Sequence, residues 1–179
     1  MRTLPIAPVV VGVAGAESMT TLKKLLRPLH PPEASPADCP QSPGRFVQTP
    51  EFGSMVVGTG PVRIGTDGAG NPRQGFHPSG DHGWLALKTH FDETPADDEG
   101  PFLVRGERLD RPGVIHIGST PADRAPLLVL GNMHPTGRGR WQDLPYFTFV
   151  RTPGCYGWQI DGLDFSTTVV VRILPTYNP

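Results

Sequence analysis

The C-terminal stretch from Tyr146 to Ile173, YFTFVRTPGCYGWQIDGLDFSTTVVVRI, constrains the fold more than any other part of the chain. Residues 155–160 alternate between large apolar side chains and small or polar ones, which is the period of a strand with one apolar face. A turn is expected next, where Gly162 can take the positive φ that a tight turn needs. Every second residue from 165 to 173 is then apolar or a threonine. The stretch therefore predicts a β-hairpin.

The facing of this hairpin decides where Cys155 points. The large side chains of Tyr156 and Trp158 favour the core, so the side chain of Cys155 is expected on the opposite face of the same strand. A partner must then come from outside the hairpin, and Cys39 is the only other cysteine. Because Cys39 lies in the proline-rich segment ASPADCPQSPGR, a Cys39–Cys155 disulfide would fasten that segment across the outer face of the hairpin. Two buried free thiols are the alternative.

Short β-branched runs separated by proline and glycine fill most of the remaining chain. Proline and glycine each account for 22 of the 179 residues. Many short strands with such turns are typical of a sandwich or a barrel. Together with the hairpin, about eight to nine strands are expected, almost without helix. The other strands are expected in the runs 54–57, 62–64, 84–91, 101–110, 114–118, 127–131 and 146–150.

The first residues carry a signal-like pattern. An apolar run from Leu4 to Val13 is followed by Ala14-Gly15-Ala16, which resembles a signal-peptidase site. The alternative is that VVVGVAG forms a first strand or an ordered arm. The run is too short to span a bilayer.

A short amphipathic helix is expected after this run. Leu22, Leu25, Leu26 and Leu29 recur at helical spacing, and Pro28 and the following HPPEASP end the pattern. The apolar stripe is expected to dock on the chain's own domain, with a membrane surface or a partner as alternatives. Residues 1–45 are thus interpreted as an N-terminal arm and residues 46–179 as one β-sandwich domain.

The second half of the chain resembles a family of uncharacterised bacterial proteins, of actinobacterial and Chloroflexi type, that are secreted or lipoprotein-like. The resemblance rests on GPFLVRGERLDRPGVIHIG and on a C-terminal motif of the form PGCYxxQxDGxxFS, and it covers roughly Gly100 to Ile173. It implies an exported or lipid-anchored domain with an immunoglobulin-like β-sandwich. The lipid-attachment cysteine of such proteins is absent here, and Gln142-Asp143-Leu144-Pro145-Tyr146 departs from the family's W-x-x-F-P-S-Y segment.

Composition and motifs narrow the function classes. A net charge of −1 provides no field for nucleic acid or an anionic membrane. The densest polar cluster is FHPSGDHGW, where His77, Asp81 and His82 could form a two-His, one-carboxylate metal site, although solvated loop residues are the plainer interpretation. No G-x-S-x-G motif or activated thiolate is recognisable. We therefore predict a chain that is not an enzyme and needs no cofactor.

The best binding candidate is the segment that leads into the C-terminal stretch. It combines large aromatic, sulfur and guanidinium side chains with glycines, and Trp, Tyr and Arg dominate interface hot spots. The alternative is that its tryptophan packs on the edge of the sandwich. The candidate residues are Met133, Arg138, Arg140, Trp141 and Tyr146.

These observations lead to a non-catalytic, extracytoplasmic immunoglobulin-like antiparallel β-sandwich that serves as an interaction or structural module. Its partner would be a protein or an envelope component, and the N-terminal arm could take part in assembly. The alternatives are a small metal-dependent hydrolase built on the histidine cluster and a carbohydrate-binding module that uses Trp84, Trp141 or Trp158.

Overall fold

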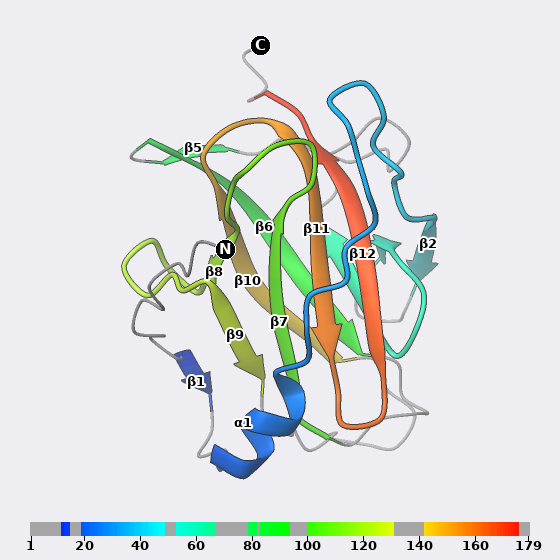
Figure 1. Ribbon diagram of the computed structural model, residues 1–179, viewed down its shortest axis with the longest axis vertical. Helices are drawn as coiled ribbons and strands as arrows, with labels where there is room; N and C mark the ends of the chain where they lie inside the picture. Colours follow the sequence, from blue (N-terminus) through cyan, green and yellow to red (C-terminus); the bar gives the residue numbers. More distant parts are fainter. Residues whose placement is uncertain are drawn as a thin grey trace, which may run out of the picture.

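The protein is a two-layer β-sandwich with one short helix (Figure 1). The computed structural model describes residues 12–14, 19–48, 53–66, 79–81, 83–93, 100–130 and 142–175. Its strands form a five-stranded sheet, here called sheet A, and a seven-stranded sheet, here called sheet B. All strand pairs are antiparallel except one, so the expected all-β antiparallel sandwich is confirmed.

Sheet A has the strand order β1-β9-β7-β11-β12. Its C-terminal hairpin is the predicted one, with Tyr156 opposite Val171 and Trp158 opposite Val169. The strands of sheet A are β1 (Gly12–Ala14), β7 (Phe102–Arg108), β9 (Leu127–Leu130), β11 (Gly154–Asp161) and β12 (Ser166–Ile173).

Sheet B has the order β2-β3-β4-β6-β10-β8, with β5 paired to β6 at one end. The longest strand, β6, lies inside this sheet between β4 and β10, as the alternation in residues 84–91 predicted. The described residues contain twelve strands rather than eight or nine, because the short strands β2 and β5 were not expected and β1 was expected only as an alternative. Sheet B consists of β2 (Gly44–Gln48), β3 (Gly53–Val57), β4 (Val62–Thr66), β5 (Ser79–Asp81), β6 (Trp84–Glu93), β8 (His116–Gly118) and β10 (Gln142–Val150).

The turn of the hairpin differs from the prediction in one respect. Gly162 has no positive φ; among the described glycines only Gly58, Gly60 and Gly83 do. The turn is closed by a hydrogen bond from Gly162 N to Phe165 O at 3.0 Å. A Cβ atom at position 162 would lie 2.0 Å from Cε1 of Phe165, so glycine is needed here because the aromatic ring packs against the backbone.

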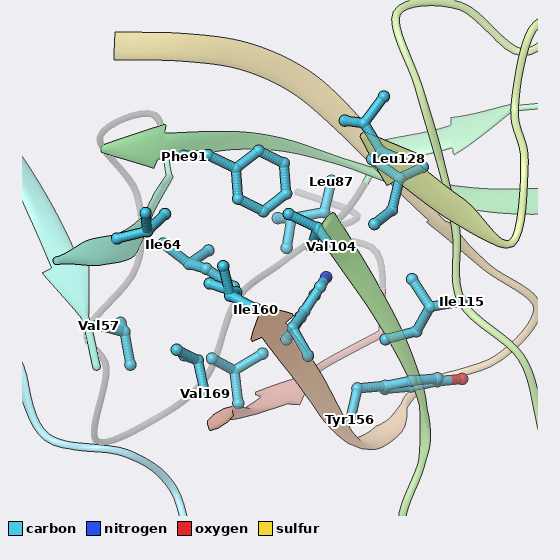
Figure 2. Packing of buried hydrophobic residues seen from close by; sticks show 14 of the residues in the cluster. Val57, Ile64, Leu87, Phe91, Val104, Ile115, Leu128, Tyr156, Ile160 and Val169 are labelled. Carbon is cyan, nitrogen blue, oxygen red and sulfur yellow. The ribbon is translucent and has the colours of Figure 1, made fainter. Parts of the chain in front are cut away.

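The core lies between the two sheets (Figure 2). Sheet A contributes large inward side chains, among them Tyr156 and Trp158, which are 1% and 0% exposed. Sheet B contributes the inward face of β6, including Leu87 and Phe91. Ile64 and Val57 of sheet B face Ile160 and Val169 of the hairpin across this layer in Figure 2. The inward facing predicted for the hairpin is therefore confirmed.

The N-terminal part of the chain packs on sheet A. β1 pairs in parallel with β9, so the alternative interpretation of VVVGVAG as a strand matches its described residues. The helix α1 (Met19–Leu25) buries Leu25 completely against Leu103, Leu127 and Val129 on the outer face of the sheet. Leu22 packs there as well, whereas Leu26 and Leu29 are 45% and 38% exposed, because the helix ends at Leu25. The helix thus docks on the chain's own domain, as expected.

The division into an arm and one domain at residues 45 and 46 stays a prediction, and β2 spans it.

Candidate functional site

The outer face of sheet A carries a buried polar network centred on Asp161. This carboxylate is fully buried and accepts hydrogen bonds from Arg105 Nη2 at 3.0 Å, Gln159 Nε2 at 3.0 Å and Ser166 Oγ at 2.6 Å. The residues meet there because β7 and β11 are neighbours and Arg105 is opposite Gln159 in the register. These partners offset the cost of burying the Asp161 carboxylate, so we assign this residue a structural role.

The segment between α1 and β2, residues 26–43, runs across this network, and we call it the strap. Figure 1 shows it in blue, in front of β11 and β12. Its backbone supplies the remaining partners: His30 N donates to Gln159 Oε1 at 2.8 Å, and Pro28 O accepts from Gln159 Nε2 at 2.9 Å. The guanidinium of Arg27 donates to the carbonyls of Phe165 and Leu163 in the hairpin turn. The strap therefore completes the polar network beneath it.

Farther along, the strap is fastened covalently and covers a sheet edge. Cys39 and Cys155 form a disulfide with an S–S distance of 2.03 Å, on the outer face of β11, as the facing of the hairpin predicted. Ser42 N then donates to Val170 O, and the side chains of Ser42 and Gln41 accept from Val170 N and Arg172 N. β12 is the last strand of sheet A, so these bonds satisfy backbone groups that would otherwise be open to another strand.

A second polar cluster lies where β7 and β11 meet the neighbouring turns. Arg108 forms an ion pair with Asp110 at 2.5 Å and donates to Thr152 Oγ1 and to Pro153 O at 2.7 Å. The hydrogen bond from Arg108 lowers the pKa of the Asp110 carboxyl, and burial raises the pKa of Tyr156, whose hydroxyl donates to Thr152 O at 2.7 Å. The partners of this cluster are internal, which indicates a role in holding the turns.

The outer face of sheet B presents aromatic side chains instead. Trp84, Ala86 and Phe149 form a small buried cluster, with Phe147 packed against it. The register places Phe149 between Ala86 of β6 and His116 of β8, so three strands contribute to one row. The ring of His116 lies 5.0 Å from that of Trp84. This row forms the floor of the candidate site.

Two arginines from separate loops lie over the indole of Trp84. The guanidinium carbon of Arg151 is 3.7 Å from the ring centroid, and that of Arg124 is 4.8 Å from it. Such cation–π contacts contribute roughly 0.5–1 kcal/mol each at exposed sites. Arg151 follows β10 directly and Arg124 precedes β9, so sheet topology brings them together from distant parts of the sequence. We call Trp84, His116, Arg124 and Arg151 the basic cluster.

The charges of the basic cluster are all positive. Burial, Arg124 and Arg151 together lower the pKa of His116, so the imidazole is neutral at pH 7 while both guanidiniums carry charge. Nδ1 of His116 is buried and has no hydrogen-bond partner among the described residues. Two unit charges thus share one aromatic ring, and the arrangement can attract an anionic group.

The structure places the predicted binding residues only in part. Tyr146 lies on β10, is half-buried and packs on the core with its ring 6.3 Å from that of Phe91. Burial, followed by the charge of Asp123, raises its pKa. Met133, Arg138, Arg140 and Trp141 lie outside the described residues. Gln142, the first described residue after them, pairs with Glu93, at the end of β6 remote from Trp84.

The predicted metal residues are described only through the backbone of Asp81, which pairs with Trp84 in β5 and β6. His77 and His82 lie outside the described residues. Among the residues that are described, no three His, Cys, Asp or Glu side chains are grouped to hold a metal ion.

The two described tryptophans, Trp84 and Trp158, are too buried to stack on a sugar. Trp158 is 0% exposed within the core, so the expectation that it could stack on a sugar is wrong. Trp84 is 7% exposed, and arginines lie over its ring. Trp141 lies outside the described residues.

No protein-family model matches the sequence, and no curated protein matches it. No helix within the described ranges has the length and apolar character needed to cross a membrane.

The basic cluster is the part of the candidate site that the sequence did not predict. Trp84 and Arg151 are far from His116 and Arg124 along the chain, and the four residues belong to no spacing pattern. The one sequence feature that pointed to this surface was the position of Trp84 on β6. The alternation of the strand puts this large aromatic side chain on the face opposite the core.

Proposed function

We propose that this protein is a non-catalytic, extracytoplasmic β-sandwich of immunoglobulin-like type that serves as an interaction or structural module, either in the cell envelope or as an accessory subunit of a larger assembly. The observation that carries the proposal is the disulfide between Cys39 and Cys155. It joins the strap to the hairpin across 116 residues, and disulfides of this structural kind persist in oxidising compartments.

The surroundings of the disulfide support a structural role. Around it, Asp161, Gln159 and Arg105 use their polar atoms to hold the strap and each other. The Arg108 cluster likewise uses its donors on the turns beside β11. These polar residues of sheet A thus fix the chain's own arm and turns, as suits a rigid module that contacts its partner through another surface.

The surface that best suits a partner is the basic cluster on sheet B. Arg151 is exposed, and aromatic and arginine side chains meet there in the combination that dominates interface hot spots. Membership of the bacterial family that Gly100 to Ile173 resembles would agree with export, and we include that membership in the proposal.

Intact mass measurement on protein recovered from the cells that make it tests the compartment. Free thiols are alkylated at the moment of lysis, and the mass is compared before and after reduction. We expect neither Cys39 nor Cys155 to be alkylated until the protein is reduced. Native mass spectrometry of the same material should show the chain in a larger complex. Two cysteines that are alkylated without reduction would overturn the extracytoplasmic assignment.

A further inference from the structure

The two guanidiniums of the basic cluster have no counter-ion within the described part of the chain. The ion pairs formed there are Arg105 with Asp161 and Arg108 with Asp110, both on other faces of the molecule. The guanidinium carbons of Arg124 and Arg151 lie 4.8 and 3.7 Å from the centroid of the same indole ring. The distance between the two carbons therefore cannot exceed the sum of these two distances. Like charges held this close repel each other, and a bound anion close to both would relieve that repulsion.

The acidic residue that adjoins Arg124 in the sequence is engaged elsewhere. Asp123 precedes Arg124, yet its carboxylate accepts from Ser119 N at 3.2 Å, from Thr120 N at 2.6 Å and from Thr120 Oγ1 at 3.0 Å. Burial raises the pKa of Asp123, but the bonds from Thr120 and Ser119 outweigh it and lower the pKa overall. Asp123 therefore shapes its own turn and does not form an ion pair with Arg124.

Most donors of the two arginines remain available. A guanidinium has five N–H donors in a planar fork. Within the described residues, Arg124 Nη1 donates to Pro121 O, and Arg151 Nη1 donates to Gly83 O at 3.1 Å. These bonds and the indole hold each guanidinium in place, so part of the ordering cost of binding is met in advance. A planar fork with free donors matches the geometry of a carboxylate or a phosphate.

We propose that Arg124, Arg151 and His116 form a binding site for an oxyanion, a carboxylate or a phosphate, of the binding partner at the outer face of sheet B. This inference rests on the proposed function and names the chemistry through which the module would hold its partner. The site suits a single anionic group and not a polyanion, because the chain as a whole has a net charge of −1 and the positive charge is local.

Titration of the full-length chain with small oxyanions tests the site. Sodium phosphate and sodium acetate are added separately at constant ionic strength, with sodium chloride as the reference, and NMR follows the imidazole of His116 and the indole N–H of Trp84. We expect saturable shifts of both signals with phosphate, with acetate or with both. Phosphate alone would assign a phosphate-bearing partner, and acetate alone would assign a carboxylate. If phosphate and acetate shifted the two NMR signals no more than sodium chloride does, the inference would be overturned.

Matched variants separate a site from a general charge effect. Arg151→Gln and Arg124→Gln should each weaken binding by about tenfold, the loss expected for one charge-assisted hydrogen bond. Arg111→Gln removes the same charge from an exposed turn near Asp110 and should leave the affinity unchanged. Equal weakening by Arg111→Gln would overturn the inference. Bridged cysteines in native protein together with no anion binding would leave the proposed function standing and refute this site alone.

Discussion

The side-chain amide of Gln159 donates to both carboxylate oxygens of Asp161, each at 3.0 Å, and to the carbonyl of Pro28 at 2.9 Å. One amide thus links the only fully buried carboxylate found in the described residues to the strap that covers it. The pair shows that the strap and the hairpin form one hydrogen-bonded unit, and changes beneath the strap should be felt in the stability of the whole domain.

Replacing Asp161 by asparagine should lower the free energy of unfolding by about 3 kcal/mol, because Arg105 would lose its ionic partner in a largely buried position. Urea denaturation at pH 7 measures the change. Asp164→Asn, in the exposed part of the hairpin turn, is the matched control and should change stability by less than about 0.5 kcal/mol. Equal effects of the two variants would show that the network contributes nothing specific.

The helix offers a comparison between neighbouring leucines. Leu25 is completely buried against Leu103, Leu127 and Val129, whereas Leu26 is 45% exposed. Leu25→Ala should lower the free energy of unfolding by about 2–4 kcal/mol through lost burial and the cavity left behind. Leu26→Ala should cost less than about 0.5 kcal/mol. If chemical denaturation gave similar values for both, the docking of α1 on sheet A would be wrong.

Loss of the disulfide should be costly. The bridge closes a loop with a sequence separation of 116 residues, for which chain entropy gives a stabilisation of about 4 to 5 kcal/mol. A double variant, Cys39→Ser with Cys155→Ser, should therefore unfold at a markedly lower urea concentration than the oxidised protein. Reduced wild-type protein is the control and should behave like the double variant. A loss below about 1 kcal/mol would contradict the role given to the bridge.

The arginines of the basic cluster should control the titration of His116. Burial, Arg124 and Arg151 lower its pKa from the ordinary value of 6.5, so removal of either positive charge should raise the pKa towards that value. An NMR titration of the imidazole in Arg151→Gln measures this shift. Arg111→Gln should leave the titration unchanged, and an unchanged pKa in Arg151→Gln would contradict the geometry of the cluster.

The same shift makes stability depend on pH. Since the folded pKa of His116 lies below that of the unfolded chain, the unfolded state takes up a proton first as the pH falls. The contribution of neutral His116 is complete above about pH 6.5 and is lost as the pH falls from there towards the folded pKa. A His116→Gln variant should therefore lose less stability than the wild type between pH 7.5 and 5.5, as measured by urea denaturation. Parallel profiles would contradict this account.

The sequence was most informative in the C-terminal hairpin, where one alternating pattern predicted both the core residues and the disulfide. In the hairpin, the parity of residues 155–160 placed Trp158 in the core and Cys155 outside, and the outward cysteine predicted the bridge to Cys39. The helix was predicted as an amphipathic element that ends at Pro28, but it ends at Leu25. For this reason Leu26 and Leu29 were expected in the docked stripe although they are exposed.

What the sequence did not predict depends on strand order. Arg124 and Arg151 meet over Trp84 only because β8 and β6 both pair with β10, and local periodicity carries no information about such neighbours. The parallel pairing of β1 with β9 was missed for the same reason. The fold class was thus predictable from local patterns, while the basic cluster required the complete topology.

The strap has a consequence for how the chain is made. Its partners lie far downstream: Arg27 and His30 bond to the hairpin 138 and 129 residues later, and Ser42 bonds to Val170 at a separation of 128. During synthesis from the N-terminus, the strap leaves the ribosome long before the hairpin on which it rests exists. Contacts at such separations form slowly, because the loop entropy is lost before the contacts are gained. Docking of the strap is accordingly a late event in folding, and it cannot precede synthesis of the hairpin; Cys39 likewise cannot pair with Cys155 until Cys155 has been translated.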